Sequence, residues 1–284
     1  MAKFWFGPLG RLMLVDLGLT GFAEDSEKVG GVHESLNGTR TMDVTGVKGR
    51  WRINLGGLDA RALSWFEMAY RGALGPRLYL IDDQRVNLMT AGGSSAGSAW
   101  TPATEVVYTV SNGTVAEVAN PHPLLPGTLD GNAVLTPGPI SSWTWTTTIT
   151  GVIRVGEIIP VRPGQVVTFS VYVSSGTPTV EFTPFAADLT PLAQVGVTTV
   201  IAGTPPRRYY TYTVPSSGVA AVRPLMRHAA AQASTFTGLQ VETGGPPTPW
   251  VMGAGAPRVI IPKTTANRRG LGRYMDADLE LLEA

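Results

Sequence analysis

The stretch Gly49-Arg50-Trp51-Arg52-Ile53-Asn54-Leu55 alternates polar and apolar side chains, and this alternation decides the fold class. Successive side chains of a β-strand point to opposite faces, so Trp51, Ile53 and Leu55 share one face. The pattern predicts a half-buried strand. The chain of 284 residues contains 34 Gly and 22 Pro, which is typical of many short strands joined by turns. We therefore expect a mainly β protein.

Around this stretch, the first third of the chain predicts further short strands and one helix. Asp59 is suited to cap a helix that runs to about Arg71, because Leu63, Phe66 and Tyr70 recur at helical spacing. The other expected elements are strands at residues 11–16, 29–36, 41–47, 77–81 and 85–89, with a polar turn at 24–28 and a hairpin between the last two strands.

A run of Ala, Gly and Ser from Ala91 to Ser98 has no periodic face, and it predicts a boundary between two domains. From about Thr101 to Val251 the chain offers only strand signals, separated by Pro, Gly and Asn at intervals typical of a β-sandwich. In this region Asn112-Gly113 begins a glycosylation sequon. A tight turn is the preferred interpretation, because Asn-Gly readily adopts positive φ.

The last segment, from Tyr274 to Glu283, alternates acidic and apolar residues as a half-buried strand does. A single strand of this kind cannot bury its apolar face alone. We therefore predict that it returns to the first domain and completes that sheet. The first domain is then discontinuous, with residues 1–98 and 254–284, and the sandwich of residues 99–253 is an insertion.

The charge balance disfavours two classes of partner. With 22 Lys and Arg against 21 Asp and Glu, the formal net charge is +1, so no long-range field attracts nucleic acid or an anionic membrane. The aromatic cluster Phe4-Trp5-Phe6 is soon interrupted by polar residues and glycine, and we expect neither a signal peptide nor a membrane span. Only 15% of residues are charged, against about 25% in typical proteins, which suits a surface covered by neighbouring molecules.

The sequence offers few groups for catalysis or metal binding. The absence of cysteine excludes disulfides, thiolate metal sites and a cysteine nucleophile. The segment Gly93-Ser94-Ser95-Ala96-Gly97 matches the nucleophile elbow, but that motif needs a preceding strand and a following helix, and neither is predicted. His33-Glu34 begins a zinc-protease motif that Asn37 does not complete, and the other histidines, His122 and His228, are far away in sequence.

Two groups of carboxylates complete the candidates for chemistry. Asp82-Asp83 and Asp276 with Asp278 could form a calcium cluster or an acid–base pair, or they could belong to solvated faces. The solvated interpretation is favoured, since one pair lies at a predicted hairpin tip and the other on one face of a strand. The acids of the predicted sandwich form no recognisable pair for glycoside hydrolysis. We therefore expect a protein without catalytic residues, metal or cofactor, which is not an enzyme.

Aromatic side chains of the predicted sandwich are candidates for glycan contact. Trp143 and Trp145 are two residues apart on one strand, as are Tyr210 and Tyr212, so each pair shares a face. Exposed rings of this kind could stack on sugars, whereas rings with the same spacing could equally lie in the core or at a subunit interface. Both alternatives stay open at the level of sequence.

Arginines form two basic clusters, Arg207-Arg208 and Arg268-Arg269 with Arg273. No aromatic residues interleave with them to stack nucleotide bases. A solvated loop is one interpretation. Contact with acidic faces of a neighbouring subunit is the other, because arginine favours interfaces, and we name Arg268, Arg269 and Arg273 as the candidates.

Two sets of motifs carry a family resemblance. The run from Gly30 to Thr41, the strand Arg50 to Leu55 and the short helix that follows resemble the N-terminal domain of minor tail proteins of actinobacterial phages. That domain is similar in layout to the distal tail protein, whose rings cap the tail tube. The second set is Gly238-Leu239-Gln240-Val241-Glu242, Thr248-Pro249-Trp250, and the run from Val161 to Val173. It resembles jelly-roll domains of the carbohydrate-binding-module kind that recur in phage tails, and it marks the fold rather than a ligand.

The resemblance implies a structural component of a phage tail tip, made in the host cytoplasm and carried in the virion. Its first domain would form a ring, implied to be a hexamer, below the tail tube. Its partners would be further copies of itself, the tail tube protein, other tip proteins and the tape measure protein. One alternative is a receptor-binding module whose jelly roll binds host cell-wall glycan. An enzyme that degrades that glycan is the other.

Overall fold

The computed structural model describes residues 4–15, 19–34, 40–82, 85–90, 93–94, 108–118, 128–129, 133–134, 142–203, 206–251, 253, 255–268 and 275–284. The chain divides into two compact units, unit 1 with residues 1–84 and 257–284 and unit 2 with residues 85–256. Most regular structure is β, with one α-helix, which confirms the predicted fold class. Within the described ranges, no helix combines the length and the hydropathy that a membrane crossing requires.

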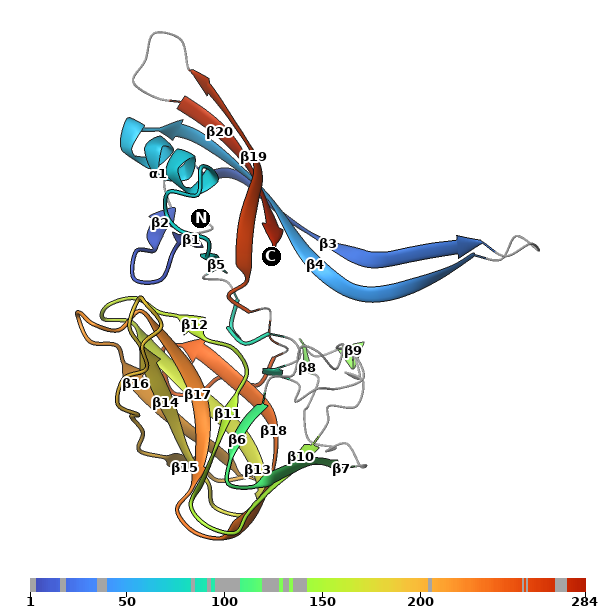
Figure 1. The fold of residues 1–284 in the computed structure, drawn as a ribbon, viewed down its shortest axis with the longest axis vertical. Helices are drawn as coiled ribbons and strands as arrows, with labels where there is room; N and C mark the ends of the chain where they lie inside the picture. Colours follow the sequence, from blue (N-terminus) through green and yellow to red (C-terminus); the bar gives the residue numbers. More distant parts are fainter. Residues whose placement is uncertain are drawn as a thin grey trace. The chain divides into compact units, whose positions relative to one another are not determined.

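Unit 1 contains one antiparallel sheet in the order β2-β1-β5-β19-β20-β4-β3, with a helix packed on it (Figure 1). Its elements are β1 (Phe4–Gly7), β2 (Met13–Val15), β3 (Leu19–Glu34), β4 (Arg40–Leu58), α1 (Ala60–Tyr70), β5 (Leu78–Asp82), β19 (Arg258–Arg268) and β20 (Met275–Glu283).

The alternation in β4 places one face of the strand in the core of unit 1. Trp51, Ile53 and Leu55 are buried, and opposite them on β20 lie the buried residues Leu281, Leu279 and Ala277. The polar faces of the two strands also meet, since Asn54 Nδ2 donates to Asp278 Oδ1 at 2.9 Å. The strand at the chain terminus therefore lies inside the sheet, between β19 and β4.

Helix α1 covers the core in the manner that its sequence predicts. The Asp59 side chain accepts a hydrogen bond from the Ala62 amide at 2.7 Å, which satisfies one of the free amides at the helix start. Leu63 and Phe66 are buried, and Phe66 stacks on Phe6 of β1 with ring centroids 5.7 Å apart. Tyr70, predicted on the same face, is exposed, because it lies at the last residue of the helix.

The predicted polar turn at residues 24–28 is wrong, because β3 runs through it as one strand of 16 residues. β3 is the edge strand of the sheet, and its backbone stays paired with β4 through these polar residues. Asp25 lies 3.8 Å from Arg52 of β4, for example. Charged residues at this position therefore indicate an edge strand rather than a break.

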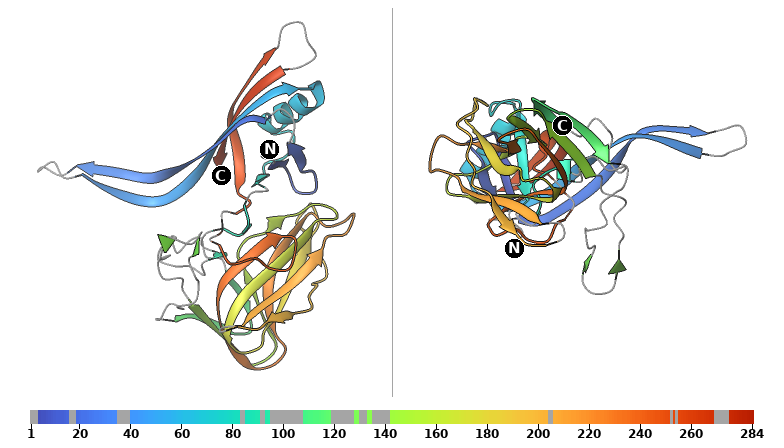
Figure 2. Two further views of the ribbon diagram at one scale, coloured as in Figure 1. Left: turned by 180° about the vertical axis from the view of Figure 1, so that it is seen from behind. Right: turned by 90° about the horizontal axis from the view of Figure 1, so that it is seen from below.

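Unit 2 contains two main sheets that form a β-sandwich (Figures 1 and 2). One sheet has the order β15-β16-β13-β18-β10-β7, and the other has the order β12-β17-β11-β6 with β14 also paired to β17. The strands are β6 (Tyr108–Ser111), β7 (Thr114–Val118), β10 (Ser142–Thr147), β11 (Gly151–Val155), β12 (Ile159–Pro160), β13 (Val166–Ser175), β14 (Thr179–Phe185), β15 (Thr199–Ile201), β16 (Arg207–Thr213), β17 (Ala221–His228) and β18 (Gln232–Thr243), with a separate pair β8 (Thr128–Leu129) and β9 (Ala133–Val134).

The two sheets bury their facing side chains against each other. Phe169 of β13 and Phe182 of β14 come from opposite sheets, are fully buried, and have ring centroids 6.1 Å apart. Asn112 joins β6 of one sheet to β7 of the other with φ 56, the left-handed conformation expected of Asn before Gly.

The segment after β5 belongs to unit 2 rather than to a hairpin of unit 1. The Leu88 amide donates to the Val241 carbonyl at 2.7 Å. The buried Asn87 side chain donates to the carbonyls of Leu239 and Val251, and it accepts from the Val241 amide. The predicted strand at residues 85–89 is therefore replaced by an irregular segment, and the unit boundary lies after residue 84.

Candidate functional site

The sheet formed by β14, β17, β11 and β6 has one face in the core and an opposite face rich in arginine. Residues paired across antiparallel strands share a face, so the register assigns each side chain. Val180, Met226 and Ile153 form one row and are fully buried. On the opposite face the successive rows are Thr179, Arg227, Val152 and Ser111, then Glu181, Leu225, Arg154 and Thr109, then Thr183 and Arg223. We call these ten residues the arginine face.

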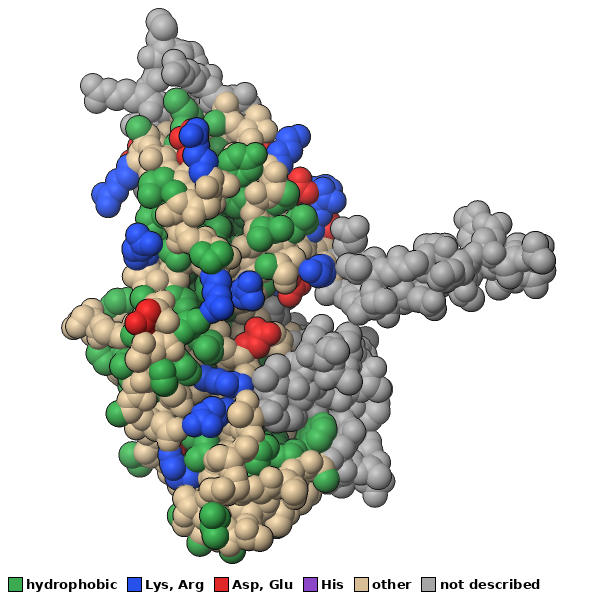
Figure 3. All heavy atoms as spheres, viewed as in Figure 1, with side chains coloured by type: hydrophobic (Ala, Val, Ile, Leu, Met, Phe, Trp, Pro, Cys, Tyr) green, Lys and Arg blue, Asp and Glu red, His purple; other side chains and the backbone are tan. Residues whose placement is uncertain are grey.

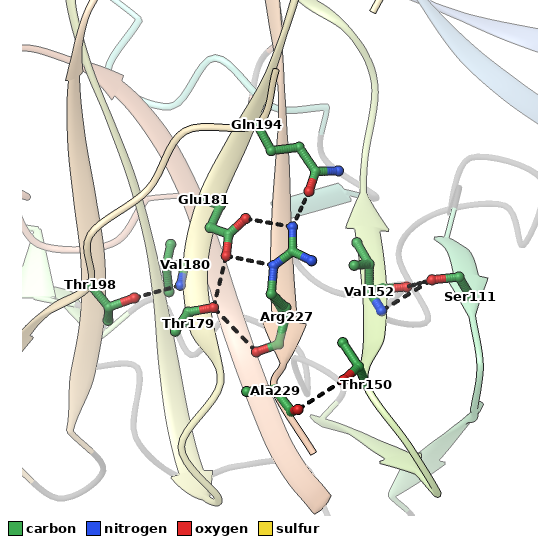
Figure 4. A network of polar contacts seen from close by, with 10 residues as sticks. All are labelled: Ser111, Thr150, Val152, Thr179, Val180, Glu181, Gln194, Thr198, Arg227 and Ala229. Carbon is green, nitrogen blue, oxygen red and sulfur yellow. Dashed lines mark hydrogen bonds and ion pairs between the residues drawn. The ribbon is translucent and has the colours of Figure 1, made fainter. Parts of the chain in front are cut away.

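At one end of the arginine face, Arg227 is fully engaged (Figure 4). Its guanidinium donates to both carboxylate oxygens of Glu181, at 2.8 and 3.0 Å, and to Gln194. The hydrogen bond to Glu181 raises the pKa of Arg227. Gln194 belongs to a segment that pairs with β14 through two backbone hydrogen bonds between Phe182 and Val195. This end of the face is a closed polar network.

Arg223 and Arg154, further along the face, are arranged differently. Arg223 donates to the Gly156 carbonyl at 3.1 Å and to the Thr109 hydroxyl at 3.4 Å. Burial lowers the pKa of Arg223, and the neighbouring charge of Arg154 lowers it further, while Glu157 acts in the opposite direction. Among the residues that the structure describes, Arg154 has no hydrogen-bond or ion-pair partner. Figure 3 shows Lys and Arg side chains gathered over β17 and β11.

Thr183 is an exception to the rule that buried polar groups are paired. It lies directly opposite Arg223 in the register and is only 4% exposed. Its hydroxyl oxygen has no hydrogen-bond partner among the described residues. Buried polar atoms are nearly always paired, so this hydroxyl calls for an explanation. The hydroxyl is enclosed on β14, whereas the hydrogen bonds of Arg223 run toward Gly156 and Thr109 on the opposite side of β17.

Sequence reasoning missed these residues because they come from three strands that are distant in the chain. Arg154 interrupts an otherwise apolar strand, and Arg223 and Arg227 lie four residues apart on one face of β17. Arginine at the polar positions of two strands was the available signal. It became a site only when the register placed the two strands side by side.

Two of the four aromatic residues predicted for glycan contact are buried, and two are half-buried. Trp145 is fully buried and Tyr212 is 9% exposed, so the core interpretation describes these two side chains. Trp143 and Tyr210 are half-buried. Tyr210 and Tyr212 both approach the core residue Phe182, with ring centroids 6.2 Å apart in each case.

Trp145 stacks on His228 with ring centroids 3.7 Å apart, inside a buried polar network. The His228 ring nitrogens lie 3.0 Å from the Thr147 hydroxyl and 2.8 Å from the Ser234 hydroxyl. Burial lowers the pKa of His228 to about 4, so the ring is neutral at pH 7. This histidine therefore serves packing and hydrogen bonding.

The Gln-x-Glu and Thr-Pro-Trp motifs form a second buried network. The Glu242 carboxylate accepts from the Thr248 amide at 3.0 Å, from the Thr248 hydroxyl at 2.6 Å and from Gln240 at 2.9 Å. Trp250 donates to the Leu239 carbonyl, and Gln240 accepts from the Val251 amide. The motifs thus tie the segment after β18 to that strand, which explains why they mark a fold.

Arg207, predicted as part of a basic surface cluster, is instead buried beside this network. Its guanidinium donates to the Ser170 hydroxyl and to the Thr248 carbonyl, and it lies 5.1 Å from the centroid of the Tyr172 ring. For the predicted interface cluster, Arg268 is the last residue of β19, and Arg269 and Arg273 lie outside the described residues.

The remaining candidates for chemistry have structural contacts. Ser94 is fully buried, and its hydroxyl accepts from the Gly253 amide at 2.8 Å. Asp276 accepts from the Gly57 amide at 3.0 Å, and Asp278 is bonded to Asn54. Asp83, His33 and His122 have no described side chain. Within the described part of the chain, no three His, Cys, Asp or Glu side chains are grouped to hold a metal ion.

Neither a family model nor a curated protein matches the sequence. Similar solved structures include the enzymatically active domain of tailspike protein 4 of bacteriophage CBA120, at 12% identity over 56% of this chain and 22% of that one, with a TM-score of 0.38. The chain thus spans about a fifth of the tailspike chain's length. A carbohydrate-binding module of the β-sandwich superfamily matches at 13% identity over 84% of this chain and 96% of that one, with a TM-score of 0.34.

A component of the phage p2 baseplate in its activated conformation matches at 9% identity over 88% of this chain and 100% of that one, with a TM-score of 0.20. All three TM-scores are below 0.5, and these similarities carry no argument about function.

Proposed function

We propose that this chain is a structural component of a phage tail tip, in which unit 1 forms a ring with further copies of itself and unit 2 is carried as an appended domain. The observation that carries the proposal is the β3–β4 ribbon of unit 1. β20 pairs with β4 only between Arg50 and Leu58, whereas β3 and β4 remain paired out to Glu34 and Arg40. The ribbon therefore extends beyond the rest of the sheet (Figure 1).

A two-stranded ribbon of this length needs a partner surface. An isolated hairpin is at best marginally stable in water, and its free edges are templates for pairing with another chain. Within the described residues, no third strand pairs with the outer part of the ribbon. A neighbouring copy in a ring would supply that surface, and a head-to-tail contact of this kind closes by rotation.

The topology of unit 1 also suits a ring protein with an appended domain. β5 and β19 are neighbours in the sheet, with Tyr79 opposite Arg258, although unit 2 lies between them in sequence. The chain thus leaves the sheet and returns to it at adjacent strands. An inserted domain can therefore be carried without disturbing the ring-forming sheet.

The sequence resemblance indicates which kind of ring to propose. It implies a distal-tail-like ring of six copies, in contact with the tail tube protein, other tip proteins and the tape measure protein, in the virion. We propose these partners on that ground, and we propose a scaffold rather than a hydrolase. The second candidate function, a receptor-binding module for host glycan, is favoured by Arg154, a partly exposed arginine without a partner among the described residues.

The ring proposal is tested by shortening the ribbon. Residues 28–47 are replaced by Asn-Gly, which forms a two-residue hairpin turn directly after the pair Glu27 and Lys48. We expect the full chain to form a closed oligomer in native mass spectrometry and the shortened chain to be a folded monomer. A full chain that stays monomeric at high concentration, with the same mass distribution as the shortened chain, would refute the proposal.

A further inference from the structure

The β3–β4 ribbon contains a β-bulge in the part that extends beyond the rest of the sheet. There Val29 lies opposite Gly46, and the next pair joins Gly30 to Val44. Thr45 is therefore an extra residue of β4, without an opposite residue on β3. Two residues of one strand that oppose a single residue of its partner define a β-bulge.

The bulge separates an outer part of the ribbon, residues 30–34 of β3 and 40–44 of β4, from the part nearer the sheet. A bulge bends its strand and increases the local twist, and the ribbon curves along its length in Figures 1 and 2. Glycines gather at the same point, with Gly30 and Gly31 on one strand and Gly46 on the other. Glycine inside a strand often marks a bulge, so the sequence and the register agree on the position of the bend.

The position of this bulge distinguishes it from the other register shifts of the sheet. Those shifts begin at Leu19, Met275 and Ile260, where a third strand is also paired. Within the described residues, no third strand pairs with the ribbon at Thr45. A bend there changes the direction of the outer part and leaves the supported strands in place. Bulges at such positions re-aim a segment or end its pairing.

We infer that the bulge at Thr45 is the positioning element of the ring, because it aims the outer part of the ribbon at the neighbouring copy at the angle that closes the ring. The inference rests on the ring proposed for unit 1. A head-to-tail contact forms a ring only if the rotation between copies closes, and otherwise it grows into an open filament. If the outer part makes the contact, its direction fixes that rotation.

The test variant is the full chain with Thr45 deleted. The deletion makes the pairs Val29–Gly46 and Gly30–Val44 consecutive, so every pair of the ribbon, and the face on which each side chain lies, is kept. Only the bend changes. Thr45→Ala is the control, because it removes the side chain and keeps the extra residue.

Native mass spectrometry and negative-stain microscopy compare the three chains. We expect the natural chain and Thr45→Ala to form the same closed oligomer, and the deletion variant to form monomers or open assemblies instead. A deletion variant that forms the same closed oligomer with the same number of copies would overturn the inference. Equal loss of the oligomer in Thr45→Ala would overturn it too, since the bulge is then not what matters.

The direction of the ribbon can also be measured within one chain. The natural sequence has no cysteine, so Glu34→Cys and Arg61→Cys allow specific spin labels at the end of β3 and on the exposed side of α1. Labelled chain is mixed with an excess of unlabelled chain, and pulsed electron paramagnetic resonance gives the distance within a copy. Five residues at about 3.3 Å each make an outer part of about 16 Å, so deletion of Thr45 should shift the mean distance by at least about 5 Å. An unchanged distance would show that the bulge does not aim the ribbon.

The outcomes separate this inference from the ring proposal. A natural chain that stays monomeric refutes the ring, and the inference with it, whereas a natural ring that survives deletion of Thr45 refutes the inference alone. The deletion variant should keep the midpoint denaturant concentration of unit 1, since no pair is lost. Insertion of one Thr between Val29 and Gly30 gives Thr45 an opposite residue and removes the bulge by a second route. If the deletion variant does not fold, this insertion variant decides, and it too should not form the closed oligomer.

Discussion

Unit 1 and unit 2 reach a stable β structure in different ways. The sheet of unit 1 is joined through β19 and β20, which come from the other end of the chain, and its β3–β4 ribbon extends past the strands that support it. Unit 2 is continuous in sequence from residue 85 to 256, and its buried polar groups are mostly bonded to one another. Unit 1 therefore depends on distant segments, whereas unit 2 depends on internal networks.

The largest effect should come from removing residues 257–284. This deletion removes β19 and β20 from the middle of the sheet, with the core residues Ala277, Leu279 and Leu281, and leaves β2-β1-β5 without a link to β4-β3. We expect unit 1 to lose its whole free energy of unfolding while unit 2 melts unchanged, as followed by hydrogen exchange of peptides from each unit. Ile260→Ser, at an exposed position of β19, is the control. In this variant both units should keep the hydrogen-exchange protection of the natural chain. If β4 kept its hydrogen-exchange protection in the truncated chain, unit 1 would not depend on the distant segment that carries β19 and β20.

The complementary experiment removes one acceptor from the buried hydrogen-bond network of unit 2. Glu242→Ala leaves the Thr248 amide and Gln240 without their acceptor and removes the carboxylate whose charge acts on the buried Arg207. Loss of one partner from a buried polar and charged network costs about 3 to 5 kcal/mol. Denaturant unfolding should show this loss in the transition of unit 2 only. Glu67→Ala, on the exposed side of α1, removes the same charge and should shift neither transition by more than about 0.5 kcal/mol.

Acid should also distinguish the two units, through His228. Its pKa is about 4 in the folded chain against an ordinary value of 6.5, so the unfolded chain binds more protons between these values. The contribution of the neutral ring is complete above pH 6.5 and is lost as pH falls toward 4, by up to about 3 kcal/mol at 1.36 kcal/mol per pH unit. The midpoint denaturant concentration of unit 2, measured from pH 7 to pH 4, should fall accordingly. His228→Gln should remove this slope, and an equally steep fall in that variant would assign the acid sensitivity to other groups.

The sequence predicted the elements whose signals are local. The alternation in β4, the Asp59 cap, the turn at Asn112 and the periodicity of β20 each depend on a few adjacent residues, and the structure contains all four features. It could not predict the arginine face, because Arg154 and Arg223 are brought together only by the register of β11 and β17. The prediction for Arg207 was wrong for the same reason. Two adjacent arginines in sequence suggest a surface, but Arg207 is buried and donates to Ser170 and Thr248, which are distant in sequence.

The smallest expected effect compares one surface ion pair from each unit. In unit 2, Glu181 binds Arg227 through both carboxylate oxygens and is 12% exposed, whereas in unit 1 Glu280, paired with Arg50, is 24% exposed. Bidentate pairs hold their geometry better than pairs with a single contact, and surface ion pairs in general contribute about 0 to 1 kcal/mol. Glu181→Gln should therefore lower the free energy of unfolding of unit 2 by about 1 kcal/mol, and Glu280→Gln should lower that of unit 1 by about 0.5 kcal/mol or less. Double-mutant cycles with Arg227→Gln and Arg50→Gln measure each coupling directly. If the coupling energy of the unit 1 pair were the larger one, polar pairs would stabilise unit 1 as much as unit 2. The two units would then not differ in their use of polar pairs.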